Sequence, residues 1–319
     1  MHCAIGGSIV AFQAILLMLT MTAAAAYAQV SGRPSPRTRS ITILTEPNAK
    51  IAIDGVSYGT TDGSGMIFLP MVPVGRKTVR VRVDGFAEAR KVLLPAQFGN
   101  VPIPLTKNID KAELAFQNGL RLSSVDRQKA IAAFEEAAKL RPAYTDAYIG
   151  LARIYSDTGE TQKAQNAIAR ARRTQPGLAE ASAIEGRVLK GIGEEEKAIA
   201  AFKRAIKEGA GFQPEAFTGL GILHKERAEN DAGSGDLNAQ AKNYIEAERY
   251  FRAAIDQLSG SEDSVVLYQL LGLVYEEQKQ AAKAIALYEE FLKLFPDNPE
   301  SEAFRSFIVQ LKKQYPYLE

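Results

Sequence analysis

The sequence predicts a protein of two parts, in which a small all-β sandwich is followed by an all-α superhelical solenoid of stacked helix pairs. Two observations carry this prediction. Small residues recur every 34 positions through the middle of the chain, as Ala130, Ala164, Ala198 and, seven residues later, Ala137, Ala171, Ala205. In the region 40–106, by contrast, apolar and polar residues alternate. A period of about 20 to 50 residues indicates a repeat array, whereas alternation is typical of strands with one buried face.

The clearest repeat unit is the segment 145–178. Its first half places Tyr148, Leu151 and Tyr155 on one helical face, and Gly159 ends that helix because glycine readily adopts the backbone conformation of a helix terminus. The second half has small and bulky apolar residues on one face and then a proline, which has no amide hydrogen to continue a helix: Ala164, Ile168, Ala171 and Pro176. The segment therefore predicts two helices whose backbones approach closely at alanines.

This pattern resembles the tetratricopeptide repeat, in which an aromatic–Leu–Ala/Gly–Tyr helix precedes an Ala–aromatic–Ala–Pro helix. The unit 265–298 fits with Tyr268, Leu271, Gly272, Tyr275, Ala284, Tyr288 and Pro296, although Phe291 replaces a small residue. The unit 179–212 fits with Gly186, Leu189, Gly193, Ala198, Phe202 and Ala205, although Ala210 replaces the proline. The first and fourth units retain Gly119, Ala130, Phe134, Ala137 and Pro142, and Phe217, Leu220, Gly221, Ala247, Phe251 and Ala254. The resemblance implies five helix pairs over 111–299 and a C-terminal capping helix and tail over 300–319.

An insertion at about 228–243 separates the two halves of the fourth unit. Gly233, Ser234 and Gly235, with the aspartates beside them, offer too little apolar surface to order a chain segment. We therefore expect a mobile, solvent-facing loop, either a tolerated insertion or a partner-binding loop.

The region 40–106 predicts short strands. Val79, Val81 and Val83 alternate with arginines, which describes a strand with one buried and one solvated face. Further short strands are expected at Thr42–Leu44, Ile51–Ile53, Met66–Leu69 and Val92–Leu94, with turns at Asp54-Gly55 and Asp62-Gly63. Because proline cannot donate a hydrogen bond to a neighbouring strand, Pro102 and Pro104 place the last strand at a sheet edge.

This stretch resembles the PEGA domain, a small β-sandwich of bacterial surface and envelope proteins. The residues that carry the resemblance are Glu46-Pro47-Asn48-Ala49, Ile51-Ala52-Ile53-Asp54-Gly55, Gly59-Thr60-Thr61, Pro73-Val74-Gly75, Val79-Arg80-Val81 and Gly85-Phe86. Asn48 stands where the family usually has glycine, and asparagine tolerates the positive φ of such a turn. The resemblance implies a location at the cell envelope more than a particular action.

The N-terminal residues 1–28 predict an export signal peptide. The run 5–26 is uncharged and largely apolar, and Ala26-Tyr27-Ala28 fits a signal-peptidase cleavage site. The alternative is an uncleaved membrane anchor, because the run is long enough to span a bilayer. Residues 29–39 are expected to form a flexible basic linker. The protein should therefore be exported to the periplasm or cell envelope of a bacterium.

Composition argues against most catalytic and nucleic-acid functions. The formal charge is +2 over 319 residues, which is too small to indicate nucleic acid as the main partner. After export the chain would have no cysteine and one histidine, His224, so that neither a Cys–His pair nor a zinc cluster is available. No phosphate-binding glycine loop followed by Lys-Ser/Thr occurs. We therefore expect no enzyme activity, no metal and no cofactor.

A partner-binding surface is predicted on the inner wall of the solenoid. In the tetratricopeptide family that wall is formed by first-helix residues pointing away from the second helix. Here these positions are Phe116, Leu120, Arg153, Ser156, Arg187, Lys190, Ile222, Lys225, Leu273 and Glu276. A basic middle between apolar ends would suit an extended peptide with an acidic or carboxylate group, because arginine offers a planar fork to a carboxylate. The alternative is an ordinary solvated face that keeps the solenoid soluble.

Two functions follow from these expectations. The first is an exported, non-catalytic scaffold or adaptor that binds a protein or peptide on the solenoid, while the β-domain locates it at the envelope. The alternative is a cell-wall or glycan-associated structural protein, in which the β-domain binds an envelope polymer and the repeats act as a spacer.

Overall fold

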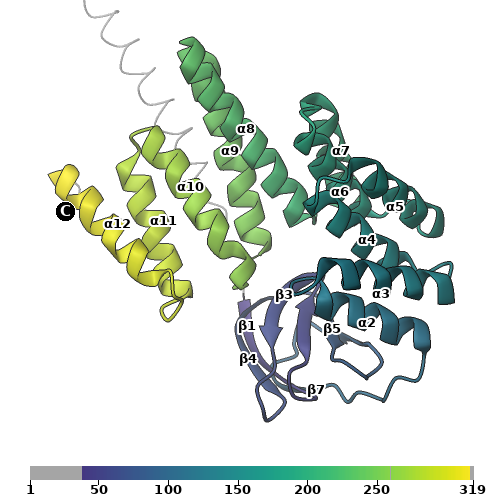
Figure 1. Cartoon of the computed structure of the whole chain (residues 1–319). Coiled ribbons are helices and arrows are strands. Elements are labelled where there is room, and N and C mark those ends of the chain that lie inside the picture. Colours follow the sequence, from purple (N-terminus) through teal and green to yellow (C-terminus); the bar gives the residue numbers. More distant parts are fainter. Residues whose placement is uncertain (1–37, 259, 317–319) are drawn as a thin grey trace, which may run out of the picture. The chain divides into compact units, whose positions relative to one another are not determined.

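The structure is a computed structural model that describes residues 38–258 and 260–316 (Figure 1). The predicted signal peptide and nearly all of the predicted linker lie outside these residues. Among the described residues, no helix has the length and apolar character needed to cross a membrane.

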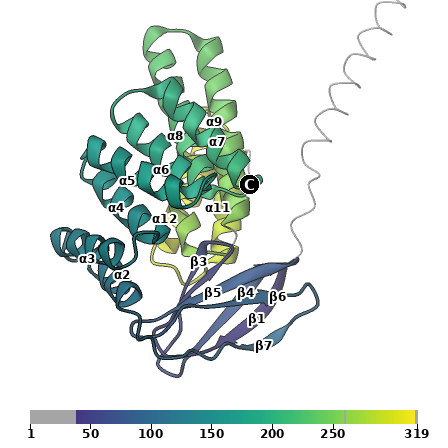
Figure 2. The same ribbon diagram turned by 90° about the vertical axis from the view of Figure 1, so that its right-hand side faces the viewer.

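The N-terminal part of the described chain has seven strands in two sheets, and most of these strands are labelled in Figure 2. The strands are β1 (Thr38–Leu44), β2 (Lys50–Ile53), β3 (Val56–Thr60), β4 (Met66–Pro73), β5 (Lys77–Arg82), β6 (Ala89–Leu93) and β7 (Gly99–Pro102). The strand orders are β4-β1-β7 and β3-β2-β5-β6. Both sheets contribute to one core, because Ile43 of β1 and Val79 of β5 belong to the same buried cluster.

The expected alternation and edge position are confirmed. Val79 and Val81 are fully buried, whereas the arginines between and beside them are not. Strand β7, which contains Pro102, lies at the edge of its sheet and pairs in parallel with β1. Asn48 has a φ of 56°, the positive value that a glycine-like turn requires. Strand β3 was not among the expected strands, because only Val56 of its five residues is buried and its sequence shows little alternation.

The rest of the described chain is a solenoid-like series of helices that contact one another in consecutive pairs. The pairs are α2 (Lys111–Leu122) with α3 (Arg127–Leu140), α4 (Thr145–Asp157) with α5 (Thr161–Thr174), α6 (Ala179–Gly191) with α7 (Glu195–Glu208), α8 (Pro214–Ser234) with α9 (Leu237–Gln257), and α10 (Val265–Glu277) with α11 (Ala281–Leu294). A short 3₁₀ turn (Glu262–Ser264) precedes α10, and α12 (Ser301–Gln314) follows the last pair.

Close helix contacts depend on matched small and large side chains. A Cβ atom added to Gly119 or Gly150 would lie 2.6 or 2.8 Å from the ring of Phe134, so both neighbouring first helices need glycine at this ring. Gly186 has the same relation to Phe202, and Gly221 to Phe251. The alanines of the 34-residue series, such as Ala164, are fully buried between their helices. The repeat period in the sequence is therefore the period of this packing.

The expected loop at 228–243 is wrong. Helix α8 continues to Ser234 and α9 begins at Leu237, so that both helices have 21 residues where the others have 12–14. Gly235 ends α8 with a φ of 80°, and Asp236 caps α9 by accepting from the amide of Ala239. Contacts between the two helices order the segment: Asn243 donates to the carboxylate of Asp231 (2.7 Å) and contacts His224 (2.9 Å). The residue composition of the segment alone could not predict these contacts between α8 and α9.

Candidate partner-binding face

The first helices α4, α6 and α8 contact one another in sequence, and Arg153 connects all three. Its guanidinium lies 2.8 Å from Glu180 of α6 and 2.8 Å from Glu215 of α8. Burial lowers the pKa of Arg153, but Glu215 and Glu180 raise the pKa by more, so its net shift is upward from the ordinary value. Arg153 is therefore a fixed positive charge held between helices.

Arg187 of α6 joins the same group. Its guanidinium lies 3.0 Å from Asp157 of α4 and 3.7 Å from Glu215, so Arg153 and Arg187 share one carboxylate. Two of the predicted binding residues, which are 34 positions apart in the sequence, thus converge on one point. We call the surface made by the exposed parts of α4, α6 and α8 around these arginines the first-helix face.

The two predicted lysines are also paired. Lys190 lies 2.8 Å from Glu226 of α8, and Lys225 pairs with Glu229 of its own helix. The four predicted cations therefore have five carboxylate partners, Asp157, Glu180, Glu215, Glu226 and Glu229. The first-helix face is charge-compensated and not a free basic stripe.

The remaining predicted residues differ in their availability. Phe116 is buried, with its ring centroid 5.6 Å from that of Phe134 and 5.1 Å from that of Tyr144, so it lies in the core and not on a surface. Leu120 and Ile222 are partly buried against the core, and Ser156 is half-buried on α4. Leu273 is exposed, while Glu276 accepts a hydrogen bond from the hydroxyl of Tyr288 (2.6 Å).

Sequence reasoning did not identify the carboxylates that compensate the cations. A signal was present, because Asp146 and Glu180 are 34 residues apart and each lies in the first turn of a first helix. Acidic residues are common there because they interact favourably with the helix dipole. Glu180 and Glu215 have a second role as well, because each forms an ion pair with Arg153 on a neighbouring helix.

The described residues offer little for other chemistry. His224 stacks on Tyr250, with ring centroids 5.5 Å apart, and contacts Asn243, so it is a packed helix residue. Within residues 38–258 and 260–316, no three His, Cys, Asp or Glu side chains gather in a way that could hold a metal ion.

These features define a helical repeat protein, and comparison with known proteins specifies the repeat. Family models described as tetratricopeptide repeats match residues 121–188 and 265–298. The chain therefore contains tetratricopeptide repeats, as the residue pattern predicted. Proteins built from these repeats are typically protein-interaction scaffolds and are generally non-catalytic.

The helical fold is similar to that of yeast Tom70. Yeast Tom70 matches with a TM-score of 0.51 and 19% identity over 65% of this chain and 41% of its own. The APC/C hetero-tetramer Cut9-Hcn1 matches with a TM-score of 0.49 and 19% identity over 66% of this chain and 38% of its own. A thermophilic tetratricopeptide protein from Thermus thermophilus has a TM-score of 0.47 and 18% identity over 62% of this chain and 99% of its own. This chain thus spans less than half the length of the first two. No curated protein matches the sequence significantly.

Proposed function

We propose that the protein is a non-catalytic scaffold or adaptor that binds a protein or an extended peptide on its first-helix face. The observation that carries the proposal is the ion-pair group around Glu215, which fixes Arg153 and Arg187 from two helices beside one carboxylate of a third. Side chains held in place before binding lose less conformational entropy when a partner arrives. Arg153 and Arg187 remain about one-third exposed, so a partner can reach them.

The partner of this face would present an acidic or carboxylate group. Such a group would compete with Asp157 or Glu215 for Arg187, and with Glu226 for Lys190. Because each cation already has a carboxylate, the gain from one exchanged ion pair would be small. Affinity would therefore depend on several contacts along the face.

Localisation belongs to the same proposal. The apolar N-terminal segment supports export, with cleavage after Ala28, and the resemblance of 40–106 to a PEGA domain supports an envelope location. The alternative remains an anchor formed by residues 5–26. Mass spectrometry of the mature protein distinguishes them: Gln29 at the N-terminus supports export with cleavage, and Met1 in the membrane fraction supports the anchor.

A second function rests on the β-region. Phe68, Leu94 and Phe98 are each exposed by 60% or more, which is unusual for side chains of this size. Aromatic and apolar side chains at a surface would suit a wall polymer or glycan, with the repeats as a spacer. Binding of a partner that survives changes to the first-helix face but is lost in Phe68→Ser/Phe98→Ser would favour this function.

The test of the scaffold function compares matched variants of the full chain. The variant Arg187→Glu/Lys190→Glu reverses two charges on the first-helix face. The control Lys203→Glu/Lys207→Glu makes the same change in net charge at exposed positions of α7. Quantitative pull-down from an envelope extract should lose specific partners only in the first variant. Circular dichroism and thermal unfolding of both variants check that a loss of partners is not a loss of fold, because the first variant also breaks the ion pairs of Arg187 and Lys190. Equal retention of partners by both variants would refute the proposed role of the face.

A further inference from the structure

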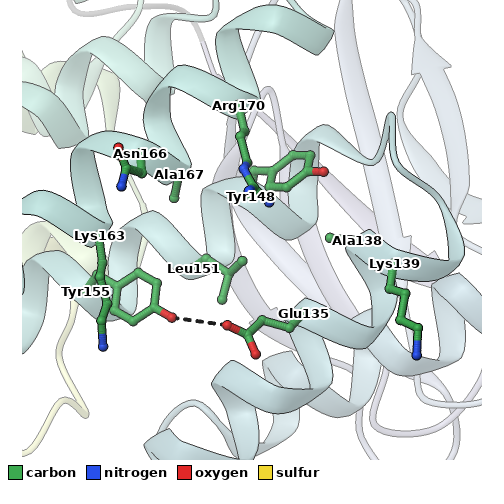
Figure 3. Close-up of a pocket in the computed structure, with 10 residues that line it drawn as sticks. All are labelled: Glu135, Ala138, Lys139, Tyr148, Leu151, Tyr155, Lys163, Asn166, Ala167 and Arg170. Carbon is green, nitrogen blue, oxygen red and sulfur yellow. Dashed lines mark hydrogen bonds between the residues drawn. The ribbon is translucent and has the colours of Figure 1, made fainter.

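A cavity of about 550 Å³ lies between α3, α4 and α5, on the side to which the second helices contribute (Figure 3). It is separate from the first-helix face, since α3 and α5 are second helices and none of the four paired cations lines it. Two tyrosines of α4, Tyr148 and Tyr155, form part of its wall, and Lys139, Lys163 and Arg170 surround them.

The aromatic rings are held in place by their neighbours. The hydroxyl of Tyr148 donates to the carbonyl of Pro142 (3.0 Å), and that of Tyr155 donates to Glu135 (3.4 Å). The guanidinium of Arg170 lies 5.9 Å from the ring centroid of Tyr148, and the ammonium of Lys163 lies 5.3 Å from that of Tyr155. These cation–π contacts direct both positive charges toward the cavity wall.

The charge of the lining is unbalanced. Three cations face one carboxylate, that of Glu135, which is engaged with Tyr155. Arg170 has no ion-pair partner in the described part of the chain. In the described part of the chain, Lys139 and Lys163 form ion pairs only with Glu136 and Glu160, each three residues earlier in the sequence. Helix α5, with the sequence TQKAQNAIARARRT, has four cationic residues and no acidic one.

Equivalent positions in two other repeats show what Arg170 lacks. Position 204 of the unit 179–212 is also arginine, and it pairs with Glu185 and donates to the hydroxyl of Ser182 (3.1 Å). Position 290 of the unit 265–298 is glutamate, which pairs with Arg252 (2.8 Å) and accepts from Tyr268 (2.9 Å). In both units an opposite charge from a neighbouring helix meets this position. In the unit 145–178 no opposite charge from the described residues meets Arg170, and the cavity lies beside its guanidinium.

We infer that this cavity is a second binding site, which takes an acidic, extended segment of a partner protein. A carboxylate of the segment would form with Arg170 the ion pair that Glu185 forms with Arg204, and a second carboxylate would reach Lys139 or Lys163. The tyrosine rings would contact the segment between its acidic side chains. Glu135 disfavours a ligand with uniformly dense negative charge, such as nucleic acid. The inference goes beyond the proposed function, because it uses a different face and different residues.

The test uses the full chain and a fluorescein-labelled peptide, (Gly-Glu)5, with (Gly-Gln)5 as the uncharged control. Fluorescence anisotropy should show binding of (Gly-Glu)5 only, weakened by salt because the attraction is electrostatic. Arg170→Glu and Arg170→Gln should weaken binding about tenfold or more, since a charge-assisted contact is lost. The matched control is Arg173→Glu, an exposed change on the same helix outside the lining, which should change the affinity by less than about twofold.

Three further measurements decide the inference. Glu135→Gln should raise the affinity for (Gly-Glu)5 about two- to threefold, because it removes the one carboxylate of the lining. In the Arg187→Glu/Lys190→Glu background, Arg170→Glu should still weaken (Gly-Glu)5 binding about tenfold, which separates this site from the first-helix face. An oligonucleotide, (dT)10, should compete poorly. Absence of (Gly-Glu)5 binding, equal losses in Arg170→Glu and Arg173→Glu, or no gain in Glu135→Gln would each overturn the inference. So would the lack of an Arg170→Glu effect in the Arg187→Glu/Lys190→Glu background, or equal competition by (dT)10.

Discussion

The helix pairs α4–α5 and α10–α11 share some contacts between equivalent positions but fill the space between their helices with different side chains. In both, a lysine of the second helix lies over a tyrosine of the first: Lys163 over Tyr155 and Lys283 over Tyr275, each at 5.3 Å from the ring centroid. Each tyrosine hydroxyl also donates to a glutamate of the preceding second helix, Glu135 or Glu248. These two contacts of the tyrosines are thus shared by both pairs.

The two pairs differ at one set of equivalent positions between their helices. In α4–α5 the facing residues are Ala152 and Ile168, both buried. In α10–α11 the equivalent residues are Gly272 and Tyr288, and a Cβ atom at position 272 would collide with the tyrosine ring. A loss of one methyl group on the first helix accompanies a gain of an aromatic ring on the second. Interiors are close-packed, so the repeat constrains the combination of side chains more than either residue alone.

The largest effect is expected from emptying the aromatic core of α10–α11. Phe291 is fully buried and contacts Tyr268 and Phe304, at ring-centroid distances of 5.4 and 4.1 Å. Phe291→Ala should lower the free energy of unfolding by about 3–5 kcal/mol, because it removes apolar burial and leaves a cavity. Val309→Ala, at an exposed position of α12, should change it by less than about 0.5 kcal/mol. Urea unfolding of both variants measures the difference.

A smaller loss is expected from overfilling α4–α5. Ala164 has no exposed surface, so Ala164→Leu should destabilise the protein by about 3 kcal/mol, the upper part of the usual range for overpacking. The neighbouring Lys163→Leu should cost much less, since its side chain is 62% exposed. Thermal unfolding of the two variants is the measurement. Equal shifts in the unfolding midpoint would contradict the helix register described above.

Exchanging the residues of the two pairs tests the compensation directly. Ile168→Phe should cost about 1–2 kcal/mol, because the ring meets the methyl group of Ala152. In the Ala152→Gly background the same change should cost less, with a coupling free energy of at least about 0.5 kcal/mol. A double-mutant cycle based on urea unfolding measures that coupling. Strict additivity would mean that positions 152 and 168 do not share one packing volume.

The smallest effect at neutral pH is expected for Tyr275→Phe, which should cost about 1 kcal/mol through loss of the hydrogen bond to Glu248. Burial, with the nearby Glu248 adding to it, raises the pKa of Tyr275 to about 12 from the usual 10.0. The native state therefore retains the proton more strongly than the unfolded chain does, and this contribution is lost as the pH rises from about 10 through about 12. Across that range Tyr275→Phe should lose less stability than the unaltered protein. Parallel alkaline unfolding curves would contradict the assignment.

The helices could be predicted because their signals are local and periodic. Ala164, Ile168 and Ala171 lie on one face of one helix, and each position recurs as an apolar residue in the neighbouring units. The long α8 and α9 could not be predicted in this way, because Asp231 and Asn243 order each other across a helix pair. Composition predicted a loop there, but the contact between Asp231 and Asn243 holds the segment in two helices.

The sequence predicted that the two arginines lie on one stripe, but it did not predict the carboxylates that pair with them. The resemblance to the tetratricopeptide repeat predicted one stripe for Arg153 and Arg187, and the structure brings both to one carboxylate. Their neutralisation depends on Glu215, which is 62 residues from Arg153 and was assigned no role from sequence. The burial of Phe116 depends likewise on Phe134 and Tyr144, both later in the chain. Pairings over such distances need the tertiary fold.

The sharing of Glu215 by two arginines has a consequence for how a ligand would exchange on this surface. A partner carboxylate that binds Arg187 in place of Glu215 would leave Glu215 paired with Arg153, so the partly buried carboxylate of Glu215 would still have a cation beside it. Removal of Glu215 itself has a different result, because both guanidinium groups then depend on Glu180 and Asp157 alone. The two arginines are thus thermodynamically linked, and occupancy at one changes the electrostatic environment of the other. A group bound at Arg187 would in this way change the electrostatic environment of Arg153 in the preceding repeat.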